Sequence, residues 1–83
     1  SEMLLGDQKP SQLFAAMKRT ARGALSDTAL LDVWSSRLPA SVQYSVVAST
    51  GTLNEKLVVA DAVLEAQRWR KPETYGHVEA ATS

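Results

Sequence analysis

The chain has 83 residues, and its nine acidic and nine basic side chains give a formal net charge of zero. This balance argues against a dedicated binder of nucleic acid or of anionic membranes, because such proteins carry a basic excess. The chain has no cysteine and one histidine, His77, so we expect no disulfide, metal site or cofactor. A domain this small buries only about 60 % of the surface that its unfolded chain exposes, and we expect self-association to add stability.

Residues 1–9 contain a short apolar run, Met3-Leu4-Leu5, followed by Gly6-Asp7. Gly followed by Asp favours a turn. The apolar run is either the end of a helix that begins upstream or a strap across the core. We expect residues 1–9 to form a linker from an upstream domain.

Residues 10–22 predict the first helix of a helical domain that spans residues 10–70. Either Pro10 occupies its first turn or Ser11 caps it. Gly23 is expected to end it in the left-handed conformation. Three large apolar side chains recur at helical spacing and predict its core face: Leu13, Phe14 and Met17.

Ser26 is a natural N-cap for a second helix that continues to Leu38. At 100° per residue, two strips of side chains emerge. The core strip holds Leu30, Leu31, Trp34 and Leu38. A smaller strip, about 100° away, holds Ala29, Val33 and Arg37. The smaller strip is either the rim of the core or a surface on which a partner helix packs.

Pro39 ends this helix and is expected to open the next at its first position. Residues 40–48 are rich in valine, which favours a strand. We nevertheless predict a short helix, because Val42 and Val46 are four residues apart and lie on one helical face.

Thr52 and Glu55 match the capping box that opens many helices, and this helix is expected to run to about Arg70. Its core face carries Leu53, Leu57, Ala60 and Leu64. A second, broad apolar face carries Val58, Val59, Ala62, Val63, Ala66 and Trp69. A helix that is apolar on two sides is buried on two sides, so another subunit is expected to cover one of them.

Residues 71–83 show no sustained periodicity and are expected to form a flexible tail. The preceding Arg68-Trp69-Arg70-Lys71 is a cluster of basic and aromatic residues. Such a cluster either binds single-stranded nucleic acid by stacking or is a helix end with a packed tryptophan. We favour the second interpretation.

No nucleophile elbow, phosphate-binding loop, dinucleotide fingerprint or metal-ligand cluster occurs, and no paired carboxylates suggest acid–base chemistry. We therefore expect no enzymatic activity. No apolar run approaches the roughly 18–20 residues that span a bilayer, so we expect a protein that does not enter membranes and that stays in the cytoplasm.

Two blocks of sequence resemble the Gag polyprotein of gypsy-type long-terminal-repeat (LTR) retrotransposons, over roughly residues 4–65. The first block matches Leu-Gly-Asp and Lys-Pro-Ser-Gln of that family. The second matches its Leu, hydrophobe, Trp, Arg-Leu-Pro and Val-Gln. The matching residues are Leu5, Gly6, Asp7, Lys9, Pro10, Ser11, Gln12, Leu30, Val33, Trp34, Arg37, Leu38, Pro39, Val42 and Gln43.

This resemblance implies the C-terminal domain of a capsid protein, an all-α, compact bundle of about four helices. Gag chains assemble through this domain into virus-like particles around the RNA of the element. The segment from Gly6 through the first helix would correspond to the retroviral major homology region, although Leu5 stands where retroviruses have Gln and no Glu lies near Lys9. No zinc knuckle is present, so RNA would be bound only indirectly, through a nucleocapsid segment outside this chain.

The helix that holds Val33 and Trp34 would match the helix through which retroviral capsid C-terminal domains pair. We therefore expect a homodimer interface at Ala29, Val33, Trp34 and Arg37. The expected core is Leu13, Phe14, Met17, Leu30, Leu38, Val42, Val46, Leu53, Leu57 and Leu64. Two other functions remain open. One is a domesticated SCAN-like or Arc-like dimerisation domain, and the other is a nucleic-acid-binding helical domain that uses Lys18, Arg19, Arg22, Arg68, Arg70 and Lys71.

Overall fold

Four α-helices follow one another along residues 4–70, the part of the chain that the computed structural model describes. They are α1 (Pro10–Ala21), α2 (Asp27–Ser36), α3 (Ala40–Ala48) and α4 (Leu53–Arg68). No strand occurs within this part, so the predicted all-α class is confirmed and the valine-rich segment 40–48 is a helix. The expected tail, residues 71–83, lies outside the described residues.

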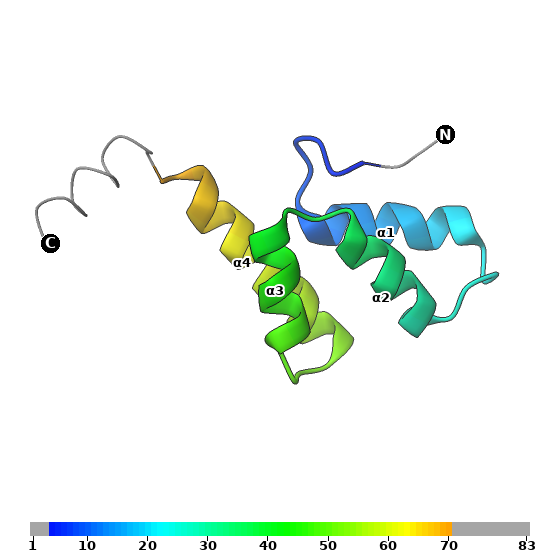
Figure 1. Cartoon of the computed structure of the whole chain (residues 1–83). Helices are drawn as coiled ribbons and strands as arrows, with labels where there is room; N and C mark the ends of the chain where they lie inside the picture. Colours follow the sequence, from blue (N-terminus) through cyan, green and yellow to red (C-terminus); the bar gives the residue numbers. More distant parts are fainter. Residues whose placement is uncertain (1–3, 71–83) are drawn as a thin grey trace, which may run out of the picture.

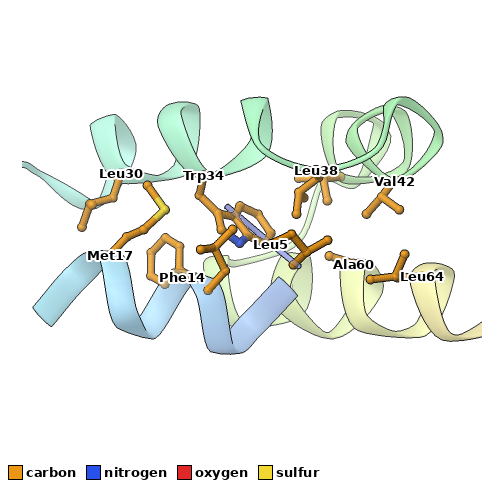
Figure 2. Close-up of a cluster of buried hydrophobic side chains, with 11 residues drawn as sticks. Leu5, Phe14, Met17, Leu30, Trp34, Leu38, Val42, Ala60 and Leu64 are labelled. Carbon is orange, nitrogen blue, oxygen red and sulfur yellow. The ribbon is translucent and has the colours of Figure 1, made fainter. Parts of the chain in front are cut away.

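The helices form a ring in which each packs against the next along the chain and α4 packs back against α1 (Figure 1). Their apolar faces meet in one core, which is centred on Trp34 (Figure 2). Eight of the ten expected core residues are buried, while Leu53 and Leu57 are half-buried and pack against the edge of this cluster. The core also includes Leu5, Trp34 and Ala60.

The segment before α1 is a strap that inserts one side chain into this core. Leu5 is buried, whereas the preceding Leu4 is exposed. Gly6 then adopts a φ of 55°, and the Gln8 amide donates to the Leu5 carbonyl at 3.0 Å, which closes the expected turn. Of the two possibilities for this segment, the described residues 4–9 form the strap.

The start of α1 matches one of the two predicted alternatives, and its end differs from the prediction in detail. Lys9 occupies the N-cap position, and its backbone N–H donates to the Gln12 side chain at 2.9 Å. Pro10 follows as the first helical residue, where a missing N–H costs nothing, so Ser11 is not the cap. At the other end the left-handed conformation begins at Arg22, with a φ of 52°, and continues through Gly23 at 80°. The helix therefore ends one residue earlier than predicted.

Helices α3 and α4 form a hairpin that is fixed at its turn. Pro39 is the N-cap of α3 and not its first helical residue, as its extended ψ of 150° shows. The predicted capping box of α4 is present, with the Glu55 carboxylate accepting from the Thr52 amide at 2.7 Å. A side chain at Gly51 would collide with the Glu55 side chain and displace it from the capping box. Lys56 donates to the carbonyl of Val46 at 3.1 Å and thereby caps the end of α3.

Candidate interaction surface

Trp34 holds α2 against the first turn of α1. Its side chain is completely buried, and its indole N–H donates to the Pro10 carbonyl at 2.7 Å. The Phe14 ring packs edge-on against the indole, with ring centroids 5.6 Å apart. A buried indole N–H needs such an acceptor, so the orientation of the Trp34 ring is fixed and with it the face that α2 turns outward.

The outward side of α2 carries the candidate interface residues. Val33 is 36 % exposed, and Ala29 and Arg37 are half-buried. These three residues form a surface strip bordered by the exposed Ser36. Trp34 does not belong to it. Because the indole is fully enclosed and hydrogen-bonded within its own chain, its expected place in the interface is wrong.

A second clamp joins the start of α1 to the middle of α4. The Asp61 carboxylate accepts two hydrogen bonds from Ser11, one from the amide at 2.9 Å and one from the hydroxyl at 2.6 Å. Arg68, about two turns further along α4, donates to the Gln8 carbonyl at 3.2 Å. The residues Lys9 to Gln12 of the first resembling block therefore begin a helix whose start is held by both α2 and α4.

The outer face of α4 is an exposed apolar surface. Its residues recur every three or four positions, opposite the core face of the same helix: Val58, Ala62, Ala66 and Trp69. Val58 is 66 % exposed and Trp69 is 78 % exposed. The expected packed tryptophan at this helix end is therefore wrong. The indole N–H of Trp69 bonds the Glu65 carboxylate, and its ring lies on the surface.

The basic residues that sequence reasoning considered for nucleic acid do not form one surface. Lys18, Arg19 and Arg22 lie at the end of α1, whereas Arg68 and Arg70 lie at the end of α4, at the opposite side of the molecule (Figure 1). Lys18 also pairs with Asp27 at 3.4 Å. A nucleic acid would therefore meet two separate small clusters.

Sequence reasoning did not identify the Asp61–Ser11 clamp. The sequence feature that could have indicated this role is the position of Asp61 on the border of the α4 core face, beside the core residue Ala60. The position of its partner, 50 residues earlier in the chain, is set by the packing of α1 on α4. No local pattern contains that information.

Among residues 4–70, no group of three or more His, Cys, Asp or Glu side chains is placed to hold a metal ion. Within the same residues, every helix is too short or too polar to cross a membrane.

Comparison with known proteins gives a family. Neither the curated proteins nor the solved structures contain a match. The model of a family described as a domain of unknown function (DUF8764) matches residues 1–65, which is most of the chain and includes all of α1, α2 and α3. The chain therefore belongs to this family of domains of unknown function.

Proposed function

We propose that this chain is a structural self-association module of a retrotransposon Gag capsid, with the fold of a retroviral capsid C-terminal domain. It dimerises and so helps to assemble a shell around RNA. The observation that carries the proposal is the contact between the two blocks of sequence that resemble Gag. The 2.7 Å bond from the Trp34 indole to the Pro10 carbonyl joins residues 5–12 to residues 30–43 at the centre of the bundle. The residues that carry the resemblance thus form one structural unit.

The proposed dimer contact lies on α2, at Ala29, Val33 and Arg37. A two-fold contact uses the same patch on both copies, so a helix with a small apolar strip can pack against itself. Val33 stands at the centre of this strip and is exposed, whereas the neighbouring Trp34 is fully buried. The strip is small, so the contact is weak. Weak contacts suit a shell, since many of them act together.

The test is Val33→Asp, which places two carboxylates within the proposed contact. We expect the variant to remain helical by circular dichroism, because Val33 lies outside the core cluster. We expect its dimerisation, measured by sedimentation over a concentration series, to weaken by about tenfold or more. Val47→Asp is the matched control, since Val47 is 76 % exposed on α3. Equal dimerisation of the Val33 and Val47 variants would contradict the α2 contact.

A domesticated SCAN-like or Arc-like dimerisation domain is the first alternative. The flanking sequence of the full-length protein separates the two. A downstream protease and Cys-His knuckle indicate an element, whereas tandem zinc fingers indicate a transcriptional regulator. Electron microscopy of the longer protein provides the physical test, because capsid function requires shells.

Binding of single-stranded nucleic acid is the second alternative, and the exposure of Trp69 between Arg68 and Arg70 favours it. Base stacking on such a ring stabilises complexes with RNA. Against it, the Glu65 carboxylate is bonded to the Trp69 indole and would repel a phosphate backbone. Salt-dependent binding of an RNA oligonucleotide that is lost in Trp69→Ala would support this alternative.

A further inference from the structure

We propose that the outer face of α4 is a second surface for self-association, separate from α2, on which a second copy of this chain packs. The two α4 helices run antiparallel, and the two-fold axis passes near Ala62. This inference does not depend on the Gag assignment, because it uses neither the resembling blocks nor the α2 strip. Its residues are Val58, Ala62, Ala66 and Trp69, with Glu55 at the start of the helix.

The face has the composition of a helix contact. The spacing from Val58 to Ala62 to Ala66 to Trp69 keeps all four side chains on one side of α4, opposite Ala60 and Leu64 in the core. Small residues stand in the middle, so that two helix backbones can approach to about 8 Å. Tryptophan is enriched at the energetic centres of interfaces, and here it is 78 % exposed.

The face is also complementary to itself. A hollow of about 580 Å³ lies at the start of α4, and its lining is Ser49, Thr50, Gly51, Asn54, Glu55, Val58 and Val59. Trp69 protrudes at the other end of the helix. Glu55 lies seven residues before Ala62, and Trp69 lies seven residues after Ala62. Each is therefore about 10 Å from Ala62 along the helix axis. A two-fold axis at Ala62 therefore brings each Trp69 to the hollow of the other copy.

The charges at the two ends of α4 agree with this orientation. Glu55 lies in the first turn, where the neighbouring Lys56 is bonded to the end of α3, whereas Arg68 and Arg70 outnumber the one acid, Glu65, at the end of the helix. Antiparallel packing places the acidic end of one helix beside the basic end of the other, and a parallel arrangement would place like charges together. The helix dipoles favour the same antiparallel arrangement.

The size of the face predicts a weak contact. Four side chains on one helix bury less than the roughly 800 Å² per partner of a standard stable interface. Dimers through α4 are therefore expected at high protein concentration, as in an assembly where other contacts raise the local concentration.

The first experiment uses the fact that a residue on a two-fold axis meets its own copy. Glu and Lys are both good helix formers at an exposed position such as Ala62. In a dimer of two Ala62→Glu chains, or of two Ala62→Lys chains, the proposed contact would bring two like charges together. In a Val33→Asp background, which removes the α2 contact, each variant is expected to dimerise about tenfold or more weakly than the Val33→Asp parent. An equimolar mixture of the Glu and Lys variants is expected to recover association. A mixture that associates no better than either variant alone overturns the proposal.

The second experiment tests Trp69 against a matched aromatic residue. In the same background, Trp69→Ala is expected to weaken dimerisation by about tenfold or more. Tyr44→Ala, at a 77 % exposed position on the outer side of α3, is expected to leave it within about twofold. Both side chains lie outside the core cluster, so circular dichroism should be unchanged. The proposal is overturned if the two changes have equal effects on dimerisation. It is also overturned if Trp69→Ala leaves self-association unchanged but abolishes binding to a single-stranded RNA oligonucleotide.

Discussion

The clamp between Asp61 and Ser11 leads to the most direct prediction about stability. Its two hydrogen bonds, at 2.9 and 2.6 Å, are part-buried and join residues 50 positions apart. They hold the first turn of α1 against α4, and the acceptor is a carboxylate at a helix N-terminus. A double-mutant cycle of Asp61→Ala, Ser11→Ala and the combination measures how strongly the two side chains interact.

The magnitudes follow from the number and kind of bonds that each change removes. Asp61→Ala removes both bonds and the favourable interaction of its charge with the helix N-terminus. It should lower the free energy of unfolding by about 2–3 kcal/mol. Ser11→Ala removes the hydroxyl bond alone and should cost about 1 kcal/mol. Once Asp61 is absent, the hydroxyl has lost its acceptor. The Ser11 change should then cost close to zero, for a coupling energy of about 1 kcal/mol.

Urea unfolding followed by far-ultraviolet circular dichroism measures these values. The measurements must be made at one protein concentration, because self-association stabilises the folded chain by mass action. Glu65→Ala is the control, since Glu65 is an exposed acid one turn further along α4 whose carboxylate accepts from the exposed Trp69 indole and not from α1, and it should cost about 0.5 kcal/mol or less. A coupling energy below about 0.3 kcal/mol would show that Asp61 and Ser11 do not interact in solution.

Two further changes test other parts of the bundle. Trp34→Ala removes a fully buried indole and its bond to Pro10, and should cost about 3–5 kcal/mol. A core this small supplies no more stabilising free energy than this loss, so far-ultraviolet circular dichroism should show an unfolded chain. A variant that stays folded but becomes monomeric would show that the two α2 faces have the reverse roles. Arg22→Gly should stabilise the chain by about 0.5–1 kcal/mol, because Arg22 has a φ of 52°. Arg22→Ala keeps that strain and serves as the control, so equal urea midpoints for both variants would contradict the conformational explanation.

The positions of the helices could be predicted because the signals that set them are local. The Thr52–Glu55 capping box and the Ser26 N-cap each act within one turn, and both make their predicted bonds. The smaller errors arise where two local solutions are similar in energy. The end of α1 is one case, since Arg22 adopts the left-handed conformation in addition to Gly23.

The surface contacts could not be predicted to the same degree, because they depend on how the helices pack. Periodicity places Trp34 and Val33 on neighbouring strips of α2, but only the bond to Pro10 decides that the indole is fully enclosed. On α4, periodicity shows two apolar faces and does not identify which of them meets the core. Packing against α1 and α3 settles this, and it leaves Val58 and Trp69 at the surface.

Two contact surfaces on one chain have a consequence that neither has alone. An isologous contact closes on itself and stops at a dimer, whereas two different ones extend an assembly without limit. Helices α2 and α4 are separated in the ring by α1 and α3, so we expect a copy bound at one to leave the other accessible (Figure 1). The mass of the unmodified chain should therefore rise beyond that of a dimer with concentration. Val33→Asp and Ala62→Glu should each limit it to a dimer, and the double variant should be a monomer. A double variant that still forms dimers would show that a third surface, such as the exposed side of α3, carries the association.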